Sequence, residues 1–205
     1  MSKFITVEGG EGVGKSTNLA FIESYLKQAG KEVVMTREPG GTALGEQLRD
    51  ILLDAQQQTI CDDTELLLMF AARAQHLNER IKPALAAGQW VVCDRFTDAT
   101  YAYQGGGRGI DKIRIGQLED WVQGDLQPDL TLLLDLPIED GMRRAGQRSA
   151  PDRFEQEQAH FFEKVRAAYL ERASQFPQRF RIIDASPSLV DVQAQIAAVL
   201  REVVN

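Results

Sequence analysis

The fold is decided by one glycine-rich stretch, Gly9-Gly10-Glu11-Gly12-Val13-Gly14-Lys15-Ser16. It matches the pattern G-x-x-x-x-G-K-[ST] in full, and it lies between a strand-like run, Phe4–Glu8, and a helical pattern that begins at Thr17. Glycines let backbone N–H groups close around phosphate oxygens, because no Cβ stands in the way. The start of the helix adds its positive end. The stretch therefore predicts a loop that binds the phosphates of a nucleotide through residues 9–17.

Two side chains of this loop have their own tasks in the predicted site. Lys15 is expected to reach the β and γ phosphates, and the Ser16 hydroxyl is expected to ligate Mg²⁺. A GTPase should also carry a guanine-reading Asn-Lys-x-Asp element, but none of the asparagines, Asn18, Asn78 and Asn205, precedes a lysine. The sequence therefore favours ATP as the bound nucleotide, and a short chain with its own arginines suggests a kinase for a small acceptor.

Strand-like apolar runs alternate with helical patterns along the rest of the chain. The expected strands are Phe4–Glu8, Glu32–Arg37, Trp90–Asp94, Leu130–Asp135 and Phe180–Asp184. The expected helices span 15–29, 42–54, 63–86, 112–123, 138–147, 155–175 and 188–203. This alternation predicts a three-layer α/β/α fold with a five-stranded parallel sheet, in a single domain over 1–205. The ligand of such a sheet sits beyond the carboxyl ends of the strands.

Length and charge exclude several other classes of protein. The chain has 205 residues, a hydrophobic fraction of 43% and a net charge of −7, and no apolar run is long enough for a membrane span. An acidic chain without a basic stripe is a poor candidate for gripping a nucleic-acid backbone. Because the N-terminus runs straight into a strand with no charged-then-apolar leader, we expect a cytoplasmic protein.

Arginines and acids follow two of the predicted strands. Arg37 lies in Thr36–Thr42, where a Pro-Gly-Gly turn allows the backbone to approach another group closely. The alternative is a tight turn with a solvated Arg. Asp94 and Arg95 end the third strand. This pair could hold Mg²⁺-bound water and an acceptor phosphate, because guanidinium groups match phosphate oxygens, or it could be a structural ion pair.

A second group of residues suits a base and a sugar. Phe70 and Arg73 are three apart, so they share a helix face, where the ring could stack on a base and the guanidinium could bond its carbonyl. A core Phe beside an Arg bound to a backbone carbonyl is the alternative. A hydroxyl, a ring and an amide follow within about one helical turn: Thr100, Tyr103 and Gln104. The glycines of 105–107 are expected to give a sharp exit, and a surface helix with a flexible loop is the alternative.

Four arginines fall close together after the fourth strand: Arg143, Arg144, Arg148 and Arg153. Nearby Gly146, Ser149 and Pro151 suggest mobility. The segment is typical of a lid that closes arginines over a triphosphate, and we expect it to span approximately 137–155. The alternative is a solvated helix face.

Together, in this order and spacing, these stretches resemble the bacterial thymidylate kinases, a family of P-loop nucleoside monophosphate kinases. The resemblance covers essentially the whole chain. It implies transfer of the γ-phosphoryl group of ATP to dTMP, giving dTDP and ADP, in a homodimer that uses Mg²⁺. A kinase for another nucleotide or a small metabolite, and a non-catalytic nucleotide-binding switch, are the alternatives.

The resemblance also implies roles for single residues. Glu11 is expected near the acceptor sugar and the transferred group, and Asp94 is expected to be tied to Mg²⁺. The variable positions of the loop hold no Arg, so the lid should supply the catalytic arginine, from Arg148 or Arg153. The implied catalytic set is Glu11, Lys15, Asp94, Arg95, Arg148 and Arg153.

The acceptor side is implied in the same way. Arg95, with Arg37 close by, is expected to bind the acceptor phosphate. Tyr103 is expected to crowd the 2′ position and so select deoxyribose. The expected contacts to thymine come from Phe70, which stacks on the ring, Arg73, which bonds a carbonyl, and Thr100 and Gln104.

Overall fold

Short runs rich in Val, Ile and Leu form the central strands of the fold, where they are buried on both faces of the sheet. The computed structural model describes residues 2–54, 60–145 and 152–204. The strands are β1 (Phe4–Glu8), β2 (Val33–Arg37), β3 (Trp90–Asp94), β4 (Leu130–Asp135) and β5 (Phe180–Asp184). They form one five-stranded parallel sheet in the order β2-β3-β1-β4-β5. The predicted sheet is confirmed, and only the start of β2 differs, by one residue.

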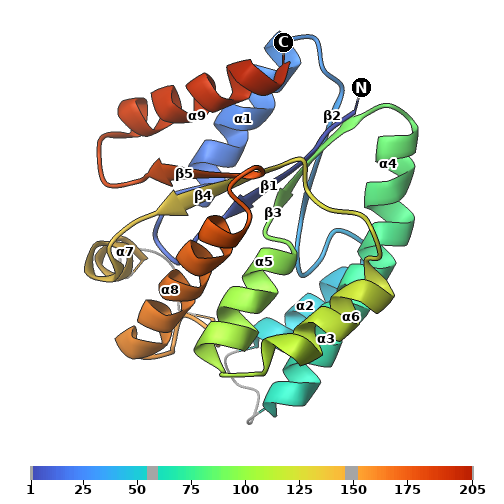
Figure 1. Ribbon diagram of the computed structural model, residues 1–205, viewed down its shortest axis with the longest axis vertical. Coiled ribbons are helices and arrows are strands. Elements are labelled where there is room, and N and C mark those ends of the chain that lie inside the picture. Colours follow the sequence, from blue (N-terminus) through green and yellow to red (C-terminus); the bar gives the residue numbers. More distant parts are fainter. Residues whose placement is uncertain (1, 55–59, 146–151, 205) are drawn as a thin grey trace.

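Helices cover both faces of this sheet, which confirms the three-layer arrangement (Figure 1). The α-helices are α1 (Lys15–Gln28), α2 (Ala43–Leu53), α3 (Asp62–His76), α4 (Lys82–Ala86), α5 (Thr97–Thr100), α6 (Lys112–Val122), α7 (Ile138–Ala145), α8 (Ala159–Gln175) and α9 (Leu189–Val204). Two π-helical segments are η1 (Leu77–Ile81) and η2 (Tyr101–Gly107). In Figure 1, α1 and α9 lie on one face, and α3, α5, α6 and α8 lie on the other.

The strand register brings the functional ends of β1, β2 and β3 to one edge. Asp94 of β3 is paired with Val7 of β1 on one side and with Arg37 of β2 on the other. The loop that follows β1 and the residues that follow β3 therefore meet beyond this edge, as expected for a parallel sheet.

The segment after β3 differs from the prediction. The glycines at 105–107 do not produce a sharp exit, because helical structure continues through η2 to Gly107. η2 packs directly on α8. A Cβ on Gly107 would lie 2.3 Å from the Phe161 ring, and one on Gly106 would lie 2.9 Å from the Lys164 carbonyl oxygen. These glycines allow two helices to approach closely.

The predicted helix over 63–86 is a continuous helical run of changing type. α3 gives way to η1 after His76, and α4 begins at Lys82 with Pro83 in its first turn. Proline has no N–H to donate to the preceding turn, which accounts for a widened π segment directly before it. No helix in the described part of the chain is long and apolar enough to span a membrane.

Candidate functional site

The glycine-rich loop joins β1 to α1, as the sequence predicted. Gly14 caps α1 in the left-handed conformation, with φ of 87°. The Lys15 Nζ folds back over the loop and donates to the carbonyl oxygens of Gly9 at 3.3 Å and Gly10 at 3.0 Å. Burial and the positive charge of Arg95 lower the pKa of Lys15. Two cations held so close to each other make this a site for an anion.

The loop also touches the helix that follows β4. Gly12 has a φ of +71°, and a Cβ built on it would lie 2.0 Å from the carbonyl oxygen of Gly141 in α7. Gly141 in turn would place its own Cβ 2.6 Å from the Glu11 carbonyl oxygen. The loop and α7 are therefore in backbone contact through two glycines that face each other.

Arg95 turns the chain at the end of β3. It is the one described non-glycine residue with a positive φ, 66°, a conformation that non-glycine residues adopt rarely and that is often found at functional sites. Its guanidinium donates to Glu11 Oε1 at 2.6 Å and to the Gly9 carbonyl oxygen at 3.0 Å. The Tyr103 hydroxyl donates to the same Glu11 oxygen at 2.9 Å, and the Arg95 guanidinium lies over its ring. Three of the predicted site residues thus meet in one cluster.

Glu8 lies beneath this cluster at the end of β1. It is fully buried, and it accepts hydrogen bonds from the Phe96 backbone N–H at 2.7 Å and the Tyr169 hydroxyl at 2.8 Å. Burial and the negative charge of Asp98 raise the pKa of Glu8 to about 8. Arg95 also donates to the Tyr169 hydroxyl at 3.2 Å, so Tyr169 links Arg95 to Glu8 through hydrogen bonds.

A second buried network surrounds Arg73. Glu38 accepts from Arg73 Nε at 2.7 Å and bonds His76 Nδ1 at 2.9 Å, while Arg73 Nη2 donates to Thr100 Oγ1 at 3.0 Å. The other ring nitrogen of His76 bonds Thr36 Oγ1 at 2.6 Å. Arg73 Nη1 is buried and has no hydrogen-bond partner among the described residues. A buried donor without a partner is costly, so Arg73 is prepared to receive an acceptor from a ligand.

Comparison with known proteins identifies the family. The thymidylate kinase family model matches residues 7–196. The thymidylate kinase of Chromohalobacter salexigens is 63% identical over 98% of this chain and 95% of its own, and that of Ectopseudomonas mendocina is 60% identical over 96% and 94%. The chain belongs to the thymidylate kinase family. The crystal structure of thymidylate kinase from Ehrlichia chaffeensis matches the fold with a TM-score of 0.80, at 35% identity over 98% of both chains.

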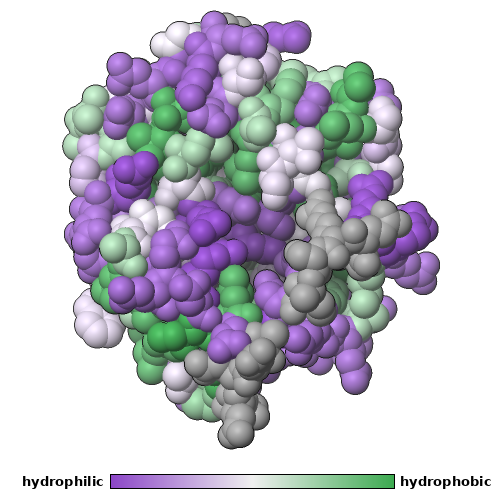
Figure 2. All heavy atoms as spheres, turned by 180° about the vertical axis from the view of Figure 1, so that it is seen from behind, coloured by the Kyte–Doolittle hydropathy of each residue, from purple (hydrophilic) through white to green (hydrophobic). Residues whose placement is uncertain are grey.

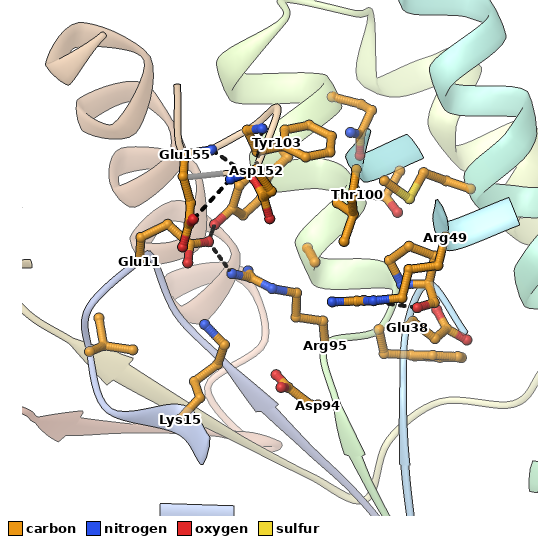
Figure 3. Close-up of a pocket in the computed structure, with 18 of the residues that line it drawn as sticks. Glu11, Lys15, Glu38, Arg49, Asp94, Arg95, Thr100, Tyr103, Asp152 and Glu155 are labelled. Atoms are coloured by element: carbon orange, nitrogen blue, oxygen red, sulfur yellow. Dashed lines mark hydrogen bonds and ion pairs between the residues drawn. The ribbon is translucent and has the colours of Figure 1, made fainter. Parts of the chain in front are cut away.

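Most of the residues that the thymidylate kinase resemblance singled out line one cavity between the loop, α2, α3 and η2. Those of them that line it are Glu11, Gly12, Val13, Gly14, Lys15, Ser16, Arg73, Asp94, Arg95, Thr100, Tyr103 and Gln104. Figure 3 shows Lys15 and Arg95 reaching in beside Glu11 and Asp94. A hollow bordered by hydrophilic side chains is visible near the middle of the face in Figure 2.

Other predicted residues of this thymidylate kinase do not line that cavity. Arg37 is half exposed and pairs with Glu46 at 2.7 Å. Phe70 is buried against the Arg73 guanidinium, 4.8 Å from the ring centroid, so it packs on the arginine. Arg153 donates to Glu65 at 2.6 Å and to the Leu52 carbonyl oxygen at 2.8 Å. Arg148 and residues 146–151 of the predicted lid lie outside the described residues.

Arg49 was missed from the sequence and lines the cavity in the place expected for Arg37. It reaches in from α2, and its Nη1 donates to the Pro39 carbonyl oxygen at 3.0 Å (Figure 3). Burial and the positive charge of Arg37 lower the pKa of Arg49. No local signal in the sequence distinguishes the two arginines: Glu46 pairs with Arg37 outside the cavity, while Arg49, one helical turn after Glu46, lines it.

Proposed function

We propose that this thymidylate kinase transfers the γ-phosphoryl group of ATP to dTMP in the cavity between the glycine-rich loop and η2. The observation that carries the proposal is the convergence of four cationic side chains, from four separate segments of the described chain, on one cavity: Lys15, Arg49, Arg73 and Arg95. Phosphoryl transfer between two anions needs this arrangement, because the task is to hold both phosphates and stabilise the charge that spreads during transfer. dTMP is mostly a dianion at pH 7, so no strong general base is required.

We assign the acceptor phosphate to Arg95 and Arg49. Both guanidinium groups line the cavity and can bind phosphate oxygens through paired N–H donors. Glu11 and the Gly9 carbonyl hold Arg95 in place, which keeps the acceptor aligned with the donor. We assign Arg37 a structural role. It donates to Glu46, which also accepts from the Gly41 N–H, and these bonds stabilise the turn before α2.

The base and sugar are assigned to the other end of the cavity. Arg73 Nη1 would donate to a thymine carbonyl, which supplies the partner that this atom lacks. Thr100 and Gln104 line the same end, and the Tyr103 ring lies between it and Glu11, where it would crowd a 2′-hydroxyl. Phe70 supports Arg73 from behind, and Met69 and Phe96 supply apolar contacts.

The residues present also fit Mg²⁺. Within the part of the chain that the structure describes, Asp94 Oδ1 is buried without a hydrogen-bond partner, and Asp94 and Ser16 line the same cavity. Mg²⁺ is bound through one or two protein oxygens together with substrate phosphates and water, so this sparse set is sufficient. The ion, when bound, neutralises charge on the β and γ phosphates. Asp94 and Ser16 would hold it at the mouth of the loop.

The lid assignment is divided between two arginines. Arg153 would have to leave Glu65 and the Leu52 carbonyl to reach a triphosphate. Of the two arginines that the resemblance implies, we therefore assign Arg148 as the catalytic lid arginine, and we assign Arg153 to anchoring the lid on α2 and α3. Lid closure would exclude water from the transferred group and suppress ATP hydrolysis.

A homodimer through the face formed by α3 and α6 is part of the proposal. These helices pack together, and Leu67, Ile113 and Trp121 on them are large apolar side chains exposed to solvent. Sedimentation velocity should give twice the chain mass, and Leu67→Glu should shift the protein towards monomer. The cytoplasmic location and the single-domain description of 1–205 remain predictions from the sequence.

The test of the function is a coupled ADP-release assay with ATP and Mg²⁺ against dTMP, dUMP, AMP, GMP, CMP and no acceptor. Turnover that is strongest with dTMP would support the assigned base and sugar contacts. Strong turnover with another acceptor would leave the loop assignment in place and remove the thymidine assignment. Tight ATP binding without turnover on any acceptor would favour a nucleotide-binding switch.

A further inference from the structure

We propose that Glu65 determines which base the cavity accepts, by holding the Gln104 amide so that its oxygen faces the base. Glu65 lies on α3, one layer behind the cavity, and does not line it. It would act through Gln104 and is therefore a positioning residue. This inference rests on the proposed function, because it explains how thymine is distinguished from cytosine at the assigned site.

Among the described residues, three side chains donate hydrogen bonds to the Glu65 carboxylate. Glu65 is fully buried. Its Oε1 accepts from Gln104 Nε2 at 2.8 Å and from Arg108 Nε at 3.4 Å. Its Oε2 accepts from Arg153 Nη2 at 2.6 Å and from Arg108 Nη2 at 3.4 Å. Because arginine only donates, both carboxylate oxygens are committed as acceptors.

This environment leaves the Gln104 amide only one orientation. If the amide were turned over, its oxygen would face a carboxylate oxygen in a buried site, and neither atom would have a proton to share. The nitrogen therefore faces Glu65. Gln104 is itself buried and lines the cavity, so its oxygen is the group left to receive a donor from a ligand.

The cavity thus presents a donor and an acceptor with fixed polarity. Arg73 Nη1 is the donor, and Glu38 and Thr100 fix its guanidinium. The Gln104 oxygen is the acceptor. Thymine offers the complementary pair on one edge, a C4 carbonyl and an N3–H. Cytosine offers the reverse, an amino group at C4 and an unprotonated N3, so both of its groups would be opposed.

The decisive variant is Glu65→Gln, which keeps the shape of the side chain. The bond from Arg153 at 2.6 Å is much shorter than the bond from Arg108 Nε at 3.4 Å, so the carbonyl oxygen of the new amide should stay with Arg153 and the amide nitrogen should take the position that faces Gln104. Gln104 would then have to turn over and present N–H to the base. We expect kcat/KM for dTMP to fall and kcat/KM for dCMP to rise, so that their ratio narrows roughly tenfold or more.

The matched control is Glu157→Gln, which removes charge from another carboxylate paired with Arg108 and leaves Glu65 intact. Its ratio of dTMP to dCMP activity should stay at the wild-type value, and thermal melts should show that both variants are folded. A structural role for Glu65 would lower both activities in parallel. An unchanged ratio in Glu65→Gln, with the protein folded, would therefore overturn the inference.

A second substitution protects the test against loss of folding and reports the polarity directly. In the double variant Glu65→Gln with Gln104→Glu, residue 104 is again an acceptor towards the base. The preference for dTMP over dCMP should return, at least in part, and a further loss would contradict the proposal. Absence of dTMP turnover in the wild-type enzyme would instead reject the proposed function itself, so the two failures are distinguishable.

Discussion

Lys15 donates to two carbonyl oxygens of its own loop, which are neutral acceptors at 3.0 and 3.3 Å. Phosphate oxygens are charged acceptors and form stronger bonds, so the ammonium group should transfer to them when a nucleotide binds. Removing it should leave the transferred charge without its main cation.

We therefore predict that Lys15→Ala lowers kcat by a factor of about 100 or more while the protein stays folded. The ADP-release assay measures the loss, and circular dichroism with a thermal melt checks the fold. Near-normal turnover in this variant would remove the loop lysine from the mechanism.

Arg49 and Arg37 provide a matched pair of substitutions. Arg49→Ala should raise KM for dTMP by roughly tenfold or more, because a charged hydrogen-bond donor to the acceptor phosphate is lost. Arg37→Ala removes a half-exposed ion pair with Glu46 and should change KM for dTMP by less than about twofold. Steady-state kinetics on both variants show which arginine binds the acceptor phosphate. A larger rise in KM from Arg37→Ala would return the acceptor phosphate to Arg37, as predicted from the sequence.

Glu8 makes stability depend on pH in a defined direction. Its pKa is raised from 4.5 to about 8 in the folded protein, so the folded state holds a proton that the unfolded state releases. The stabilising contribution is fully present below about pH 4.5 and is lost as the pH rises through about 8.

Glu8→Gln cannot titrate and should not lose this contribution. The free energy of unfolding of the variant, minus that of the wild type, should therefore increase between about pH 5 and about pH 8. Urea unfolding at several pH values measures it. Curves that stay parallel across the range would show that Glu8 titrates normally.

At the scale of elements, the contact between η2 and α8 positions the residues assigned to the base and sugar. Gly106→Ala would place a methyl group 2.9 Å from the Lys164 carbonyl oxygen and should destabilise the protein by about 1–3 kcal/mol. Gly116→Ala on α6 is the control, because its nearest neighbour, the Tyr101 hydroxyl, would be 3.5 Å away. The control should be neutral or stabilising by up to about 1 kcal/mol. Chemical denaturation of both variants tests the difference, and equal effects would contradict the close-packing interpretation.

Most elements could be predicted from the sequence because their signals are local. Apolar runs predicted the strands, and the glycine-rich motif predicted the loop between β1 and α1. The segment over 97–107 was harder, because glycines that allow packing look the same as glycines that end a helix. Arg37 was predicted near the acceptor phosphate because it ends a strand, and Arg49 carried no such signal. Which of the two arginines lines the cavity depends on how the turn before α2 directs each side chain. His76 and Glu65 carried no local signal, because their partners are distant in sequence.

At the scale of the whole molecule, a chain with a net charge of −7 carries a cluster of cations in its cavity. The surrounding acidic field works against the approach of an anionic acceptor, so the local arginines must dominate at short range. Salt should weaken this attraction. We predict that KM for dTMP rises as ionic strength increases from about 0.05 to about 0.5 M, while inhibition by uncharged thymidine changes little. Equal salt dependence for both would rule out the phosphate contact as the source.

The contact between Gly12 and Gly141 has a consequence for sequence change. A glycine at this position of the loop leaves room for a ligand. Here Gly12 also leaves room for Gly141 of α7, because a Cβ on Gly12 would lie 2.0 Å from the Gly141 carbonyl oxygen. A protein engineer who introduced an arginine at position 12, to move the catalytic cation from the lid into the loop, would first have to redirect the helix after β4. In this protein position 12 is therefore closed to a loop arginine for steric reasons, before any question of chemistry arises.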